Sequence, residues 1–233
     1  MKSLVNGCFG LLFCLMITGC GGDQVWTKVV PCDQEKVDEA LNHSRENGMM
    51  VSFETLAQSG LMEAQTREAF SEAIKTLPAG AESRVGPSLN FTLLHYFVSG
   101  DKSDEWIEFL IDAGASLESL DSAGEKPLHP AVMRGDIATA RLLLEKGADP
   151  NSADIYGYTP LFKWAIYTRG EKLKEMYSLL IEYGADPHVY RVSTTGSDEY
   201  PTPYDCIRYR AEKRDDVEAE LMLQEMTEPP NQF

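Results

Sequence analysis

The feature that most constrains this chain is an internal repeat of constant period. The segment DSAGEKPLH at residues 121–129 aligns with DIYGYTPLF at residues 154–162, and every shared residue is displaced by 33. The segment LLLEKGADP at residues 142–150 matches LLIEYGADP at residues 179–187, and FLIDAGAS at residues 109–116 is a further copy. A repeat of this length predicts a stack of similar helical units, because one unit is too small to bury its own apolar face.

The recurring residues have roles that follow from helix chemistry. Thr159 stands where a side-chain oxygen caps the first helix of a unit. Pro160 suits the first turn of that helix, because the amide at this position has no partner within the helix. Gly147 and Gly184 stand where the second helix ends, since glycine readily adopts the left-handed conformation of a helix terminus. The spacing therefore predicts two short helices in each unit, with a turn that leads to the next.

The pattern resembles the ankyrin repeat, which reads D-x-x-G-x-T-P-L-H, then two antiparallel helices, then L-L-x-x-G-A-D. The copy at residues 121–149 departs from it with Lys126 in place of threonine. The resemblance implies an all-α solenoid of stacked helix-turn-helix pairs with finger loops. Its clear repeats cover residues 89–187, and a weaker fourth copy opens at Thr202. The resemblance further implies that other proteins bind at the loop tips and at the concave face of the first helices.

The first residues do not belong to the repeats. An apolar stretch over residues 8 to 17 follows a positive start, and it is shorter than the roughly 20 residues that span a bilayer. It has the size of a signal-peptide core. The sequence Ile-Thr-Gly-Cys at residues 17–20 resembles the lipobox of bacterial lipoproteins, which implies cleavage before Cys20 and acylation of its thiol. Gly21 in place of aspartate resembles the signal for the outer membrane, and ordinary secretory cleavage is the alternative.

The chain is therefore divided into five parts. Three helices are expected in the N-terminal cap, over residues 33–47, 53–58 and 62–77, and one C-terminal capping helix is expected over residues 211–226. In order, the parts are a signal peptide over residues 1–19, a lipidated tether over 20–31, a helical cap of degenerate repeats over 32–88, ankyrin repeats with the C-terminal capping helix over 89–226, and a tail over 227–233.

The charge of the chain restricts its partners. There are 37 acidic against 21 basic residues, a formal net charge of −16. Nucleic acid is not expected as a partner, because its phosphate backbone selects basic surfaces. A protein with a basic patch is favoured, since complementary fields speed and orient encounter. A solvated acidic surface with no such role is the alternative.

No disulfide is expected. Of the five cysteines, two leave with the signal peptide and Cys20 carries lipid, so that Cys32 and Cys206 remain. These two are expected at opposite ends of the solenoid, whereas a disulfide needs Cα atoms within about 7 Å of one another.

No pattern indicates catalysis, a cofactor or a metal. Residues 99–102 fit S-x-x-K, but the companion elements of that enzyme class are absent. Nucleophile-elbow, zinc-protease and phosphate-loop motifs are absent as well. The four histidines lack the spacing of a zinc site. Two of them, His95 and His129, fall on the T-P-L-H position, where the ankyrin resemblance implies that imidazole hydrogen bonds lock adjacent loops.

The aromatic residues indicate where a partner would bind. Nine of the ten tyrosines lie between residues 156 and 209. Tyrosine and tryptophan are enriched at interface hot spots, and acidic neighbours suit a basic partner, although Trp164 could instead belong to the core. The candidate partner-binding residues are Tyr156, Tyr158, Trp164, Tyr167, Tyr190, Tyr200, Asp154, Asp198 and Glu199.

A lipobox, a short tether and an ankyrin stack together resemble the immunity lipoproteins that protect bacteria from type VI secretion effectors. Some of those proteins block phospholipase effectors. The resemblance implies a periplasmic protein held to the outer membrane only by its N-terminal lipid, with a lipase or phospholipase toxin as partner. The alternative is a periplasmic scaffold, similar to the ankyrin proteins associated with peroxide defence.

Overall fold

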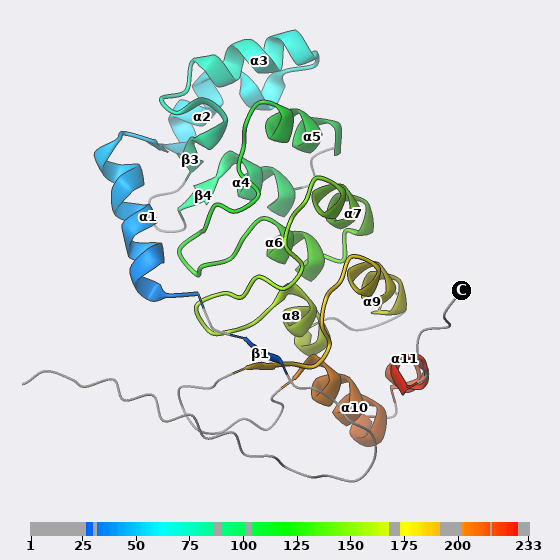
Figure 1. The fold of residues 1–233 in the computed structure, drawn as a ribbon. Coiled ribbons are helices and arrows are strands. Elements are labelled where there is room, and N and C mark those ends of the chain that lie inside the picture. Colours follow the sequence, from blue (N-terminus) through cyan, green and yellow to red (C-terminus); the bar gives the residue numbers. More distant parts are fainter. Residues whose placement is uncertain are drawn as a thin grey trace, which may run out of the picture.

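Four helix pairs stack side by side and form the body of the protein (Figure 1). The structure, a computed structural model, describes residues 27–29, 32–85, 90–100, 104–167, 173–191, 202–214 and 216–227. The pairs are α4 (Leu93–Ser99) with α5 (Asp104–Asp112), α6 (Leu128–Met133) with α7 (Ile137–Glu145), α8 (Pro160–Tyr167) with α9 (Leu173–Glu182), and α10 (Pro203–Arg214) with α11 (Val217–Thr227).

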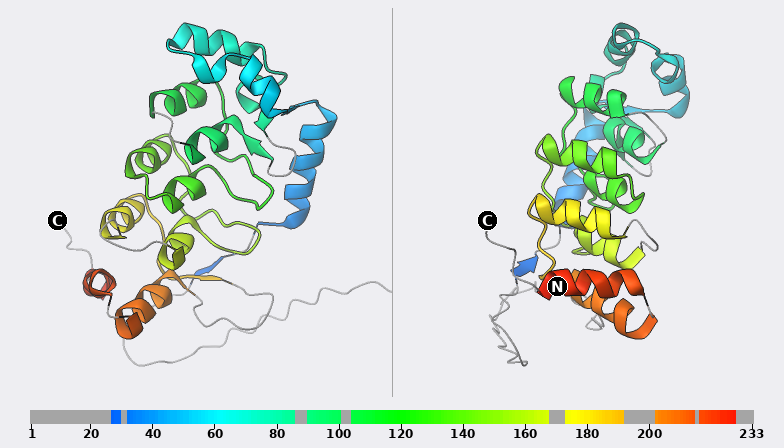
Figure 2. Two further views of the ribbon diagram at one scale, coloured as in Figure 1. Left: turned by 180° about the vertical axis from the view of Figure 1, so that it is seen from behind. Right: turned by 90° about the vertical axis from the view of Figure 1, so that its right-hand side faces the viewer.

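The pairs form two layers. The first helices α4, α6, α8 and α10 contact one another in order, and the second helices α5, α7, α9 and α11 do the same. Figure 2 shows both layers from the side. One leucine in each of the first three pairs faces its neighbours from the first helix and one from the second, and all are at most 1% exposed: Leu94, Leu128 and Leu161, and Leu110, Leu143 and Leu180. The expected all-α solenoid is confirmed.

The helix boundaries follow the repeated motifs. The side-chain oxygens of Thr92, Thr159 and Thr202 each accept a hydrogen bond from the amide three residues further on, at 3.0–3.3 Å. Gly147 and Gly184 follow α7 and α9 with φ of +97° and +87°, the left-handed conformation expected for them. The fourth copy that opens at Thr202 is therefore a complete helix pair.

The N-terminal cap covers the exposed end of the first pair. After α1 (Gln34–Glu46), the cap consists of β2 (Met50–Val51), α2 (Phe53–Gln58), a 3₁₀ turn (Leu61–Glu63), α3 (Arg67–Lys75), a second 3₁₀ turn (Gly80–Glu82) and β3 (Arg84–Val85), and β4 (Phe91–Thr92) leads into the first pair. β3 pairs in parallel with β2 and antiparallel with β4. Phe70 of α3 packs on Trp106 and Phe109 of α5, with ring centroids 4.6 and 5.3 Å apart.

Two of the expected helices differ from the structure. The helix expected over residues 62–77 is a 3₁₀ turn followed by α3, because the Thr66 hydroxyl accepts from the amide of Ala69 and starts a new helix. The helix expected over residues 211–226 is interrupted, and α11 begins after Asp216, which accepts from the amide of Ala219. In both places a side-chain cap competes with continuation of the helix.

A strand near the N-terminus is the largest departure from expectation. β1 (Thr27–Val29) lies in the segment expected to be a tether, yet it pairs in parallel with β5 (Val189–Arg191). Residues 27–29 and 32–46, which contain β1 and α1, are called the strap below. The strap runs past the finger loops of the stack to the cap (Figure 1). Cys32 consequently lies beside the third pair, whereas it was expected at the opposite end of the solenoid from Cys206; neither cysteine forms a disulfide.

Several expectations fall outside the described residues. These are the signal peptide, the lipidated Cys20, the greater part of the tether and residues 228–233 of the tail. Among the helices that the structure does describe, none combines the length and the apolar character needed to cross a bilayer.

Candidate protein-binding surface

The finger loops are held in shape by buried aspartates. We call residues 121–126 the second finger and residues 154–159 the third finger, after the helix pairs that they precede. In the third finger, Asp154 Oδ1 accepts from the amides of Tyr156 and Tyr158 at 2.8 and 2.9 Å. Asp121 makes the same two bonds in the second finger, both at 2.8 Å. Each finger is therefore a preformed turn.

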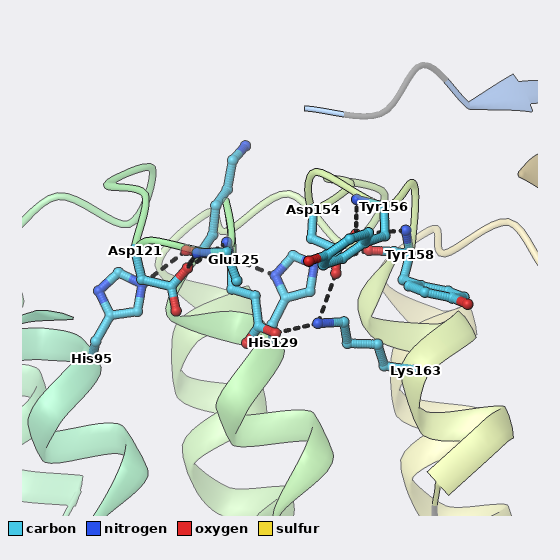
Figure 3. A network of polar contacts seen from close by, with 10 residues as sticks. His95, Asp121, Glu125, His129, Asp154, Tyr156, Tyr158 and Lys163 are labelled. Carbon is cyan, nitrogen blue, oxygen red and sulfur yellow. Dashed lines mark hydrogen bonds and ion pairs between the residues drawn. The ribbon is translucent and has the colours of Figure 1, made fainter. Parts of the chain in front are cut away.

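One buried histidine in each of the first two helix pairs joins that pair to the finger that follows it. His95 Nε2 donates to the carbonyl of Glu125 at 3.0 Å, and His129 Nε2 donates to the carbonyl of Tyr158 at 3.2 Å (Figure 3). Burial lowers the pKa of His95 to about 3 and also lowers the pKa of His129. Both rings are therefore neutral at physiological pH, and their expected structural role is confirmed.

Lys163 adds a third connection that the repeat motif does not contain. Its ammonium lies 2.7 Å from Asp154 Oδ2 and also pairs with Glu125 of the second finger (Figure 3). The residue is 7% exposed. Burial alone would lower the pKa of Lys163, but its hydrogen bonds to Asp154 and Glu125 raise it above the ordinary value. The charged lysine thus links the second and third fingers.

Four large apolar or aromatic side chains of the second and third helix pairs are exposed. Tyr156, in the third finger, and Tyr167, at the end of α8, are each 60% exposed. Met133 and Ile166 are 39% and 36% exposed, and they occupy the same repeat position at the ends of α6 and α8. We call Met133, Tyr156, Ile166 and Tyr167 the apolar surface. It spans the second and third pairs and has the residue types that dominate protein interfaces.

The strap covers part of the two fingers. The Cys32 amide donates to the carbonyl of Asp154 at 2.9 Å, and the Ile155 amide donates to that of Ala123 at 3.1 Å. A Cβ on Gly124, whose φ is +71°, would lie 2.9 Å from Ile155 Cγ2 and 3.4 Å from Cys32 Cβ. These tip residues are thus packed against one another and against the strap. A partner has access to the apolar surface but not to this part of the loop tips.

A model of ankyrin repeats in three copies matches residues 61–154 and 94–191, which together are more than half of the chain. This chain belongs to the ankyrin-repeat family. Ankyrin repeats are protein–protein interaction modules and in general carry no catalytic site, so the stack is a protein-binding module. Among the described residues, no three His, Cys, Asp or Glu side chains gather in a way that could hold a metal ion.

Proteins from distant organisms share the ankyrin segment. The chain is 37% identical over 101 residues to mouse Ankyrin repeat domain-containing protein 13B, covering 43% of this chain and 16% of that protein. An ankyrin repeat-containing protein of Schizosaccharomyces pombe is 36% identical over 91 residues, 39% of this chain and 41% of the other. A putative ankyrin repeat protein of Rickettsia bellii is 38% identical over 74 residues, 31% and 41%. The chain thus spans less than half the length of each relative.

The ankyrin structure separates the candidate partner-binding residues into exposed and buried ones. Tyr156 and Tyr167 are exposed, and Tyr158 is half-buried with its ring 5.1 Å from that of Phe162. Trp164 and Asp154 are 0% exposed, so the expectation that they contact a partner does not fit. Trp164 fills the core between pairs. Asp154 accepts the two backbone hydrogen bonds of the turn and forms an ion pair with Lys163.

The remaining candidates cannot be placed on this surface. Tyr190 belongs to β5 by its backbone, and its side chain lies outside the described part, as do Tyr200, Asp198 and Glu199. The sequence prediction did not include Met133 and Ile166, because it rested on aromatic residues and their acidic neighbours. The two stand one repeat apart, at a position where both are apolar next to a helix end, and this recurrence was the signal that could have identified them.

Proposed function

We propose that this ankyrin protein is an immunity protein, lipid-anchored in a bacterial periplasm, that binds and neutralises a lipase or phospholipase effector of type VI secretion. The observation that carries the proposal is the apolar surface, exposed on the third finger and at the ends of α6 and α8, beside fingers that are fixed by buried hydrogen bonds and by Lys163. A neutralising partner must bind tightly. Rigid aromatic anchors suit this demand, because they bury a large area while losing little conformational freedom.

The charge of the chain supports a basic partner. With a net charge of −16, the protein attracts a positively charged surface over distances longer than a contact, which raises the rate of association. Fast capture is what protection against a delivered toxin requires. The apolar surface then supplies the short-range part of the affinity.

The lipobox at residues 17–20 supports the location. Acyl chains contribute about 0.8 kcal/mol for each buried methylene, and more than one chain anchors a protein stably. An anchor on Cys20 holds the binding module at the membrane, where a lipid-degrading toxin acts.

Co-expression tests the immunity function directly. A candidate lipase effector is directed to the periplasm in cells with and without this protein, and survival is measured. We expect the protein to prevent lysis. Lysis that continues while the protein is stably expressed and acylated contradicts the proposal. Survival that depends on the protein under peroxide, but not under the lipase, favours the scaffold alternative.

A double substitution tests the surface. Tyr156→Ala with Tyr167→Ala removes the two most exposed aromatic side chains and should weaken the complex by at least about 2 kcal/mol, roughly 30-fold in Kd. Glu145→Ala, at an exposed position of α7 in the second layer, is the matched control and should leave Kd unchanged. Titration calorimetry measures both. A double variant that is folded and binds with the parent's Kd places the interface elsewhere.

A further inference from the structure

The strap is attached to the C-terminal half of the stack, although it comes first in the sequence. β1 pairs with β5, which lies between the third and fourth helix pairs. The Cys32 amide then binds the carbonyl of Asp154 in the third finger. Figures 1 and 2 show β1 near α8 and α10, whereas α3 lies at the opposite end of the stack. Thr27, the first residue that the structure describes, therefore lies beside the segment that leads from the third to the fourth pair.

We infer that the protein stands on the membrane with its fourth helix pair nearest the bilayer and its N-terminal cap farthest away. The inference rests on the lipid anchor at Cys20 that is part of the proposed function. Seven residue steps separate Cys20 from Thr27, the first residue of β1. An extended chain spans at most about 3.6 Å per residue, so that the Cα of Thr27 stays within roughly 25 Å of the Cα of Cys20.

The cap is much farther from the point of attachment. Packed helices lie about 8–10 Å apart between axes. The path from α8 through α6 and α4 to α3, which packs on α4 through Phe70 and Phe97, has three such steps and adds roughly 25–30 Å along the stack. Both ends carry exposed acidic side chains, Glu54 on α2 and Glu212 on α10, and burying a charge in hydrocarbon is costly. The body therefore stays outside the bilayer, and a short tether at one end leaves the other end directed away.

This orientation defines the kind of partner that can use the apolar surface. Tyr156, Ile166 and Tyr167 belong to the third pair, one helix spacing from the fourth. A protein bound there is held within a few tens of ångströms of the lipid headgroups. The surface thus fits a partner that works at the membrane surface, rather than one that reaches the cap from the aqueous side.

Energy transfer to labelled lipid tests the orientation. The full-length acylated protein, with Cys32→Ser and Cys206→Ala as background, receives one dye at Glu212→Cys on α10 or at Glu54→Cys on α2. Each variant is inserted into phosphatidylethanolamine–phosphatidylglycerol vesicles that carry an acceptor dye on the headgroups. We expect the transfer efficiency from position 212 to be at least twice that from position 54. Equal efficiencies, or a higher efficiency from position 54, overturn the inference.

Tether length supplies the matched control. An insertion of about twenty Gly and Ser residues between Gln24 and Val25 adds roughly 25 Å of flexible reach and should reduce the difference between the two labels. The same insertion between residues 230 and 231 should leave the difference unchanged. A difference that survives the first insertion unchanged contradicts an orientation set by the tether.

Two further readouts separate this inference from the proposed function. Intact mass and flotation with vesicles report the anchor itself. A protein that lacks acyl mass and does not float contradicts the anchored function. A protein that is acylated, floats and transfers equally from both labels contradicts only the orientation.

Discussion

The second and third fingers come from the same motif and differ in what fixes them. Both use an aspartate that accepts two backbone amides, and both receive a histidine from the preceding pair. Of the two aspartates, Asp154 in the third finger forms a direct ion pair with Lys163, which stands where the second pair has Pro130. Only the third finger carries an exposed tyrosine. The comparison shows that the motif supplies the turn, whereas residues outside the motif make one turn a rigid platform for aromatic side chains.

The buried tryptophan of the third pair gives the largest expected effect. Trp164 occupies the position of Ala131 in the second pair and is 0% exposed. Trp164→Ala should lower the free energy of unfolding by about 3–5 kcal/mol, because it leaves a cavity between pairs. Tyr167→Ala, three residues further along α8, should change it by less than about 0.5 kcal/mol. Urea denaturation compares the two. Equal losses would show that the assignment of buried and exposed aromatic residues is incorrect.

The ion pairs of Lys163 give the next effect. Lys163→Met keeps the length of the side chain but leaves the buried carboxylate of Asp154 without its cation, which should cost about 3 kcal/mol. Lys146→Met is the control, because Lys146 pairs with Glu108 and Asp112 at the surface, where such pairs add little. A variant at position 163 as stable as the parent would mean that the two fingers are not joined through this lysine.

The two aspartates should respond to substitution in opposite directions. Burial raises the pKa of Asp121 from 3.8 to about 6. Between these values the folded protein holds a proton that the unfolded chain has lost, so Asp121 reduces stability as the pH rises through this range. Asp121→Asn should therefore be more stable than the parent at pH 7, by on the order of 2 kcal/mol, and equal to it near pH 3.5. Asp154→Asn should be less stable at pH 7, because Lys163 loses a partner.

Urea denaturation of the three proteins from pH 3.5 to 8 measures this contrast. Between pH 6.5 and about 3 the unfolded chain binds a proton at His95 that the folded protein does not, so all three proteins lose stability alike as the pH falls, and this effect cancels in the differences. A loss of stability at pH 7 in Asp121→Asn would show that the carboxylate is needed in its charged form in both fingers.

The contact of the strap with the third finger gives the smallest effect. Cys32→Pro removes the amide that donates to the carbonyl of Asp154 and should cost about 1 kcal/mol more than Cys32→Ala. The second finger has no such bond from the strap among the described residues. Hydrogen exchange should therefore increase in residues 154–158 and remain unchanged in residues 121–125. Equal increases in both fingers would remove this distinction.

Local patterns made much of this fold predictable. The turns at Asp121 and Asp154, the roles of His95 and His129, and the glycine helix ends all depend on residues within one repeat or its neighbour. The constant period of the repeat reveals such relations directly. The order of the helices in the stack and their division into two layers follow from these relations, because adjacent units must stack to bury their leucines.

The remaining features depend on distant partners, which no periodicity reveals. Residues 25–30, which contain β1, are rich in β-branched residues and favour a strand, but their partner β5 begins only at Val189, after the third helix pair, and no local pattern connects the two. From the sequence alone, Lys163 would be placed at the surface. In the structure it is buried between Glu125 and Asp154. Trp164 and Asp154 were assigned to a binding surface from residue type, whereas burial depends on what the neighbouring pair places against them.

The pairing of β1 with β5 also sets an order of assembly. Contacts in a solenoid usually join neighbouring units, and loops between them are short. β1 is the first strand of the chain, whereas its partner β5 is followed only by α10 and α11 among the described elements. Closing so long a loop has an entropic cost that only a formed stack can offset. The earliest segment of the chain is thus the last to be fastened, and truncation before Val189 would leave it with nothing to pair with.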